Sequence, residues 1–242
     1  MLKNRFLKSI LALVAVLTIV SCGDGDGSGE GTPPEGLPDS IEVALDGTLS
    51  SITQELQDSI TYMYSEEGLA YDVYSNVYKI QAVKQLINIA TNSEIKHIDA
   101  VNKLAIKYDL NITKYPDTDK PYSVEDVNRY GSGQYPVEPI QELYNLLYDK
   151  GIQSQKDALE VGCMIEVVDI DDLDAYIVQA TASNASDVME VFNYLRNGSY
   201  NHYWSFDKGL KNMGVTNGCC SVPDFGSHQF CHPEYPQNTK GH

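Results

Sequence analysis

The sequence of 242 residues has little positive charge, with 17 Lys and Arg against 34 Asp and Glu and a formal net charge of −17. Because the phosphates of nucleic acids require a basic surface, this composition excludes nucleic acid as a partner. Cysteine is also scarce, and five residues are too few for a scaffold of this length to be built on disulfides. Apolar residues make up 42 % of the chain, which is enough for a packed core and excludes wholesale disorder.

Proline is absent between residues 42 and 115, and the alternation typical of strands nowhere exceeds a few residues. Apolar positions recur instead every three or four residues, which indicates helices. The predicted fold class is therefore all-α, a bundle of four long helices with an additional short helix. The long helices are expected from about 49 to a break near 82–83, over 84–108, from Ser154 to about 177, and over 186–213, and the short one over 139–150.

Two irregular positions stand out in this pattern. Residues 109–136 contain several Pro and Gly residues and are expected to form a loop, with at most one helical turn near Val124. Gly198 lies inside the last predicted helix, where glycine is unfavourable by about 1 kcal/mol relative to alanine. A kink or a close helix contact is therefore expected at Gly198.

The N-terminus has the features of a signal peptide. Three basic residues precede an apolar run of about 11 residues, whereas a transmembrane helix needs about 20. The run ends in Ile19-Val20-Ser21-Cys22, which resembles the bacterial lipobox. The resemblance implies a signal peptide over 1–21, cleavage before Cys22 and attachment of lipid to its thiol, so that the protein is anchored to a bilayer. An ordinary secretory signal with an incidental Cys is the alternative.

The rest of the chain divides by composition. Residues 22–45 are rich in Gly, Asp, Pro, Glu and Ser and are expected to form a flexible acidic tether. The helical bundle is expected over 46–213 and a C-terminal tail over 214–242. Such a protein would lie outside the cytoplasm, in a bacterial cell envelope, where thiols can oxidise.

Acidic and imidazole side chains interrupt the apolar faces of the four long helices. A buried carboxylate without a partner is costly, so it must be protonated, paired or bound to a cation. Solvated helix faces or ion pairs would also explain such residues, but among their neighbours only Lys96 is basic. Because three residues turn a helix through about 300°, Glu94 shares a face with His97, as Glu166 does with Asp169. The candidates in chain order are Glu66 or Glu67, Glu94, His97, Glu166, Asp169 and His202.

The order of these residues resembles the ferritin-like di-metal bundles. In those proteins a Glu from each of two helices and a Glu-x-x-His pair from each of the other two surround two metal ions. More closely, the chain resembles the DUF2202 family, a ferritin-like domain of unknown function, over roughly residues 55–213. The stretches that carry the resemblance are 66–74, 93–100, 157–162, 165–173 and 198–202.

The resemblance implies a set of metal ligands. Glu67 is preferred to Glu66 on the first helix, because ferritin-like proteins often have a Tyr seven residues after this Glu, and Tyr74 holds that position. Seven residues bring a helix back to nearly the same face. The implied ligands are Glu67, Glu94, His97, Glu166 and His202.

The sequence departs from the ferritin-like pattern on the fourth helix. The residue three positions before His202 is Ser199, where the pattern has Glu. Asp169, one turn from Glu166, is the candidate to supply an oxygen ligand instead. If it does not, one metal position is weak, open or empty.

Carboxylate and imidazole ligands suit iron, manganese or zinc. The family resemblance favours two metal ions, with iron first and manganese or zinc as alternatives. The expected function is that of a lipid-anchored di-metal protein with ferroxidase or peroxide- and dioxygen-handling redox activity. A non-catalytic metal-binding or surface interaction module and a structural bundle with remnant carboxylates are the alternatives. The sequence leaves the substrate, the electron partner and pairing as a homodimer open.

The C-terminal tail concentrates cysteine and histidine. A Cys/His metal site is one interpretation, but the spacing contains no Cys-x-x-Cys pair. In an oxidising compartment a disulfide is favoured, as Cys220–Cys231 or Cys219–Cys231. Cys163, on the third predicted helix, is expected to be a buried residue that packs as a small apolar side chain. The clustered residues are Cys219, Cys220, His228, Cys231 and His232.

Overall fold

A computed structural model describes residues 36–110, 132–135, 138–226 and 228–238, and structural statements refer to these residues. All the regular secondary structure among these residues is helical, and the one β-type contact is an isolated bridge between Phe225 and His228. The all-α fold class is therefore confirmed. None of these helices is both long and apolar enough to cross a bilayer. The elements are α1 (Asp39–Asp46), α2 (Gln54–Gln81), α3 (Lys84–Ile89), a π-helix (Ala90–Glu94), α4 (Ile95–Lys107), α6 (Glu138–Gly151), α7 (Gln155–Ala182), α8 (Ser186–Asn212) and a 3-10 helix (Gly218–Ser221).

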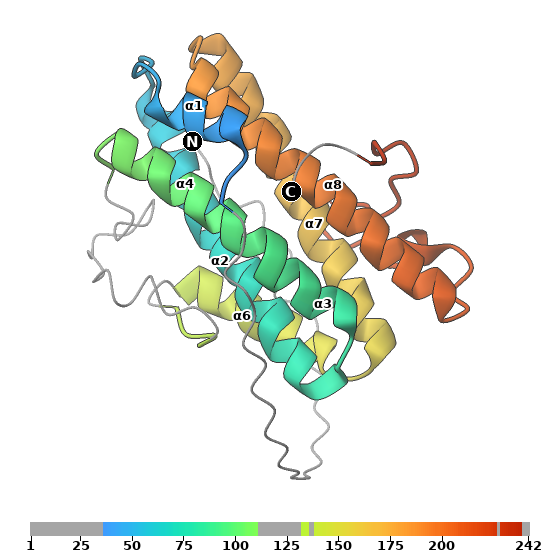
Figure 1. The fold of residues 1–242 in the computed structure, drawn as a ribbon. Coiled ribbons are helices and arrows are strands. Elements are labelled where there is room, and N and C mark those ends of the chain that lie inside the picture. The colour runs from blue at the N-terminus through green and yellow to red at the C-terminus, as the bar shows by residue number, and fades with distance from the viewer. Residues whose placement is uncertain (1–35, 111–131, 136–137, 227, 239–242) are drawn as a thin grey trace.

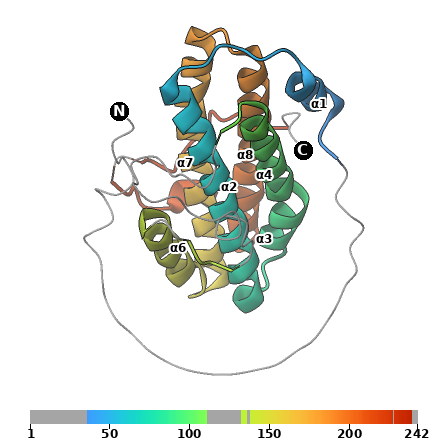
Figure 2. The same cartoon turned by 90° about the vertical axis from the view of Figure 1, so that its left-hand side faces the viewer.

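The long helices lie side by side along one axis (Figure 1). α7 and α8 form an antiparallel pair, and α2 packs against α7 and against the α3–α4 segment. The short helix α6 packs on α2 and α7, whereas α1 packs on α8 and α4, so the two lie on opposite sides of the bundle (Figure 2). The break predicted near residues 82–83 is confirmed, because Ala82 adopts a left-handed conformation (φ 51°) that ends α2.

Hydroxyl side chains cap the N-termini of two of the long helices. Ser154 accepts a hydrogen bond from the backbone N–H of Asp157 at 3.1 Å and begins α7, as predicted. Thr53 caps α2 in the same way, through the N–H of Leu56 at 3.2 Å. The predicted helix over 84–108 is interrupted by the π-helix, which the periodicity does not show.

The predicted tether over 22–45 extends too far, because its last residues form α1. Ile41 and Leu45 lie one turn apart, and both are buried in the core between α8 and α4. Lys103 also donates to the Glu42 carboxylate at 2.9 Å. Two apolar residues in an acidic stretch are too weak a periodic signal to predict a helix. In the structure both are buried, which favours the helical conformation of this stretch. The rest of the tether up to residue 35, the signal peptide over 1–21, Cys22 and the turn near Val124 lie outside the described residues.

The bundle has two hydrophobic cores with a polar layer between them. One core includes Val73 of α2 and Phe206 of α8, towards one end of the bundle. The other includes Ile60 of α2 and Leu195 of α8, towards the other end. On α2, the α3–α4 segment and α8 the acidic and imidazole candidates fall between the residues of the two cores, and on α7 they lie where the first core ends. The cores therefore keep this layer dry from both sides.

Two disulfides fix the C-terminal segment. Cys220 pairs with Cys231, as predicted. Cys163 does not remain a free thiol, and that prediction is wrong, because Cys163 pairs with Cys219. The 3-10 helix that carries Cys219 packs on α8, where the backbone N–H of Cys219 donates to Asp207 at 3.1 Å. Since the four cysteines among the described residues all form disulfides, the tail has no free thiolate for the alternative of a Cys/His metal site.

Candidate metal centre

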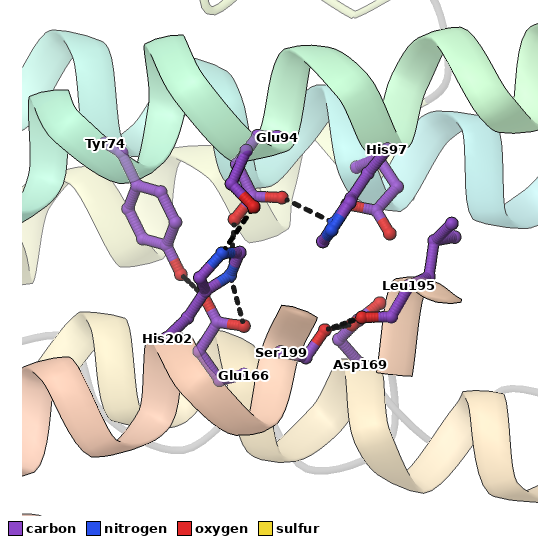
Figure 3. A network of polar contacts seen from close by, with 10 residues as sticks. Tyr74, Glu94, His97, Glu166, Asp169, Leu195, Ser199 and His202 are labelled. Carbon is purple, nitrogen blue, oxygen red and sulfur yellow. Dashed lines mark hydrogen bonds and ion pairs between the residues drawn. The ribbon is translucent and has the colours of Figure 1, made fainter. Parts of the chain in front are cut away.

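Five side chains from the four long helical segments meet inside the bundle. Figure 3 labels four of them, Glu94, His97, Glu166 and His202. Each is at most 5 % exposed, so water does not solvate the cluster. They form two groups of three that share one carboxylate, and within each group the ligand atoms lie within 4.8 Å of one another. The five residues are Glu67, Glu94, His97, Glu166 and His202.

The first group joins α2 to the π-helix and α4. The Nδ1 atom of His97 lies 3.2 Å from Oε2 of Glu67 and 3.1 Å from Oε2 of Glu94. Glu66, the neighbour of Glu67, is in neither group. The structure therefore brings Glu67 rather than Glu66 to the cluster, in agreement with the preference from the sequence.

The second group joins the π-helix to α7 and α8. The Nδ1 atom of His202 lies 3.1 Å from Oε1 of Glu94 and 3.3 Å from Oε2 of Glu166. Glu94 thus presents one oxygen to each imidazole, and it is the only residue common to the two groups. The two imidazole rings are stacked, with their centroids 5.4 Å apart.

Local backbone features allow this convergence. Glu94 is the last residue of the π-helix, and single π-turns inside helices are frequent at functional sites. Gly198 provides the space for one ring, because a Cβ added there would lie 2.4 Å from Nε2 of His97. The close helix contact predicted at Gly198 is therefore confirmed.

Two hydroxyl groups outside the cluster hold its second group. Ser93 Oγ lies 2.7 Å from Nε2 of His202, and the Tyr74 hydroxyl donates to Oε1 of Glu166 at 2.5 Å. The resemblance to ferritin-like proteins singles out Tyr74, but the sequence analysis does not identify Ser93. No sequence signal identifies Ser93, since its partner lies 109 positions along the chain.

Asp169 lies beside the cluster but in neither group. Its carboxylate accepts a hydrogen bond from the hydroxyl of Ser199, the residue that replaces the expected Glu. The side chain is 8 % exposed. The structure thus places an acidic group of α7 against the position on α8 where the ferritin-like pattern has one.

Comparison with known proteins identifies the domain. Residues 56–222 match the family described as an uncharacterized protein domain, DUF2202. The chain belongs to the DUF2202 family. Over 163 residues it is 36 % identical to the uncharacterized protein MJ0754 of Methanocaldococcus jannaschii, covering 67 % of this chain and 79 % of the relative. The crystal structure of hypothetical protein MJ0754 from Methanococcus jannaschii matches with a TM-score of 0.58 at 34 % identity, covering 70 % of this chain and 87 % of that one.

The charges in this DUF2202 domain hold the histidines protonated. Burial alone would lower the pKa of His97, but the carboxylates of Glu67 and Glu94 raise it to about 10. Burial is similarly outweighed at His202, whose pKa is raised to about 10 by Glu166 and Glu94. Without a cation, protons on the two imidazoles therefore offset part of the negative charge of the three carboxylates.

The carboxylates of the cluster respond to burial and to one another. Burial, with the charge of Asp169, raises the pKa of Glu67 well above its ordinary value. Burial also raises the pKa of Asp169 to about 8, and the charge of Glu166 adds to the shift. For Glu94, burial is outweighed by the two imidazoles, which lower its pKa. A cation here would relieve both the desolvation and the repulsion between carboxylates.

The atoms that make no hydrogen bond show which part of the DUF2202 cluster could accept a ligand. Oε1 of Glu67 is buried and makes no hydrogen bond among the described residues. Nε2 of His97 makes none either, but it is the outer nitrogen of the ring and lies against Gly198. A buried polar atom without a partner is costly, so an unpaired carboxylate oxygen in one of the two groups fits the binding of a cation. The oxygen and imidazole donors fit iron, manganese or zinc.

Proposed function

We propose that this DUF2202 protein binds two metal ions in the cluster, iron first and manganese or zinc as alternatives, and uses them in redox chemistry. The observation that carries the proposal is the position of Glu94, whose two oxygens each face a different imidazole at 3.1 Å. A carboxylate shared in this way is the arrangement expected of a bridging ligand in a di-metal bundle.

Each ion would have its own set of ligands from the chain. Glu67 and His97 would hold the first ion, Glu166 and His202 the second, and Glu94 both. Asp169 would supply the further oxygen that Ser199 cannot. The Ser199 hydroxyl donates a hydrogen bond to the Asp169 carboxylate and would hold it in position. Asp169 would thus replace the Glu ligand that the fourth helix lacks.

Two bound iron ions would supply electrons for the reduction of dioxygen or peroxide. The chain's own contribution is to exclude water, through the hydrophobic cores on both sides of the cluster. Tyr74 keeps the Glu166 carboxylate in place through its hydroxyl. Together these features favour a ferritin-like metal protein of ferroxidase or peroxide- and dioxygen-handling type.

The proposed location is the cell envelope, with the protein anchored to the bilayer through a lipid on Cys22. The lipobox-like sequence before Cys22 supports this location. The two disulfides, Cys163–Cys219 and Cys220–Cys231, support it independently, because disulfides persist in oxidising compartments.

The metal content of the purified mature protein tests the proposal. We expect about two ions per chain, by analogy with di-metal bundles, and less metal in His202→Ala and Glu166→Ala. Glu66→Ala is the matched control, because Glu66 is a buried neighbour of Glu67 outside both groups, and it should keep most of the metal. Metal at the wild-type level in His202→Ala and Glu166→Ala would refute the assignment of the site.

A non-catalytic metal-binding protein is the second candidate, favoured by Ser199 in place of Glu, which leaves the cluster one bridging carboxylate short. Fe(II) and air distinguish the two. A redox protein should develop the optical band of an oxo-bridged iron pair. Full metal content without that band would favour storage or sequestration.

A further inference from the structure

An apolar cavity of about 40 Å³ reaches the candidate metal centre. Three of the cluster carboxylates line it, those of Glu67, Glu94 and Glu166. Glu66, Asp169 and His228 also line it, but the surface that faces the cavity is almost entirely apolar, with Leu143 and Leu147 from α6 among the apolar lining residues. The hydroxyl partners of the cluster, Ser93 and Tyr74, do not line it, so the cavity meets the carboxylates from the α6 side.

The C-terminal segment forms another part of the wall through Phe225 and Phe230. Both lie after residue 222, where the match to the DUF2202 family ends. Disulfides at both cysteines of the 3-10 helix tie this segment to α7 and to itself. The Tyr203 hydroxyl donates to the carbonyl of Phe230 at 3.0 Å. The segment is therefore held firmly against the bundle as part of the cavity.

The composition of the wall restricts what can enter. The carboxylates would repel an anion, and the aliphatic and aromatic side chains offer few hydrogen bonds to a strongly polar molecule. A cavity needs about 10–15 Å³ to hold one water molecule, so a cavity of about 40 Å³ has room for a molecule of only a few heavy atoms. Apolar cavities of this kind bind small apolar guests such as xenon.

We propose that the cavity is a binding site for a small uncharged apolar molecule of about three heavy atoms or fewer, held against the Glu67, Glu94 and Glu166 carboxylates. Its use as a substrate site rests on the proposed metal centre, and the binding itself does not. At that centre the cavity would favour dioxygen over hydrogen peroxide, since peroxide would lose its hydrogen bonds to water.

Xenon is the probe for the cavity, because it is apolar and visible in crystals under xenon pressure. We expect a xenon peak between α6 and the C-terminal segment in the metal-free mature protein. Leu147→Trp should fill the cavity and abolish the peak. Ile106→Trp, which adds the same ring at an exposed position of α4, is the control and should keep it. Ala70→Leu, on the α2 wall, repeats the test should Leu147→Trp not fold.

Two results would overturn the inference: no xenon in the wild-type cavity, or an undiminished peak in a correctly folded Leu147→Trp or Ala70→Leu protein. Failure of the proposed function looks different, because a protein that takes up no metal can still bind xenon. If the protein takes up metal but not xenon, only this inference is wrong.

The wall formed by the C-terminal segment has its own test in the metal-loaded protein. Phe225→Ala should let a bulky hydrophilic chelator remove the metal several-fold faster, because it opens the cavity from outside. Ile106→Ala is the matched control, an exposed residue remote from the cavity, and should leave the rate unchanged. Equal rates in the two variants would show that Phe225 does not close the cavity.

Discussion

The two halves of the candidate metal centre have similar ligands but differ in the hydrogen bonds that those ligands make to surrounding residues. In the half that contains His202, Ser93 lies 2.7 Å from the outer nitrogen of the ring, and Tyr74 donates to the Glu166 carboxylate. In the half that contains His97, the outer nitrogen makes no hydrogen bond among the described residues and lies against Gly198. Both rings contact carboxylates through Nδ1, but the outer nitrogen of His202 has a hydrogen-bond partner, whereas the outer nitrogen of His97 is held only by packing.

This difference predicts an order of metal binding. Hydrogen bonds to the outer nitrogen of a histidine ligand fix the ring and raise its affinity for metal. The half with His202 should therefore bind the first ion, and the half with His97 the second, more weakly held ion.

The largest effect is expected from Glu94→Ala, because Glu94 is the only residue common to both halves. The variant should lose both ions, whereas Glu67→Ala should lose only the second. Elemental analysis after removal of free metal measures the difference. Equal losses in Glu94→Ala and Glu67→Ala would mean that the two halves share no carboxylate.

Gly198→Ala should disable only the packed half. A Cβ at this position would lie 2.4 Å from Nε2 of His97, so the imidazole must move, and metal content should fall to one ion. Overpacking of this kind costs about 1–3 kcal/mol of unfolding free energy. Urea denaturation of the metal-free protein measures that cost.

Gly68→Ala is the matched control for this substitution. A Cβ at Gly68 of α2 meets no atom within 4 Å. Removing a helical glycine there should raise the unfolding free energy by about 0.5–1 kcal/mol. A loss of stability in both variants would mean that the effect at Gly198 does not come from His97.

The same contrast between packing and pattern explains what the sequence could predict. The helices follow from apolar spacing because each buries one face, and the order of Glu94, His97 and Glu166 along these faces pointed to one cluster. Contacts between side chains of different helices depend on how the helices pack and on the π-helix. The contact of Ser93 with His202 therefore has no signal in the sequence. The Cys163–Cys219 disulfide was missed for the same reason.

The protons of the cluster predict an unusual pH dependence in the metal-free protein. The pKa values of His97 and His202 rise from 6.5 to about 10 on folding, and that of Asp169 rises from 3.8 to about 8. The folded state then binds more protons than the unfolded state, so the unfolding free energy should fall as pH rises from about 6 to about 9. Denaturation of the chelator-treated protein at several pH values measures this slope.

Metal affinity should change with pH in the opposite direction, because a bound cation displaces these protons. For each proton released, the apparent affinity should rise about tenfold per pH unit below the pKa of the displaced group. Competition titrations with zinc measure it. A metal affinity independent of pH over this range would contradict the protonated state of the two imidazoles.

The smallest effect is expected from Ser93→Ala, which removes the hydrogen bond at the outer nitrogen of His202. Loss of such a partner weakens metal binding by about 10–100-fold, and a single hydroxyl should lie near the lower end. The change should appear only in the first, tighter binding step, since His97 has no corresponding contact to lose. Zinc titration resolves the two steps. Weakening of the second step instead would reverse the order of binding and show that packing against Gly198 orients an imidazole better than a hydrogen bond to Ser93.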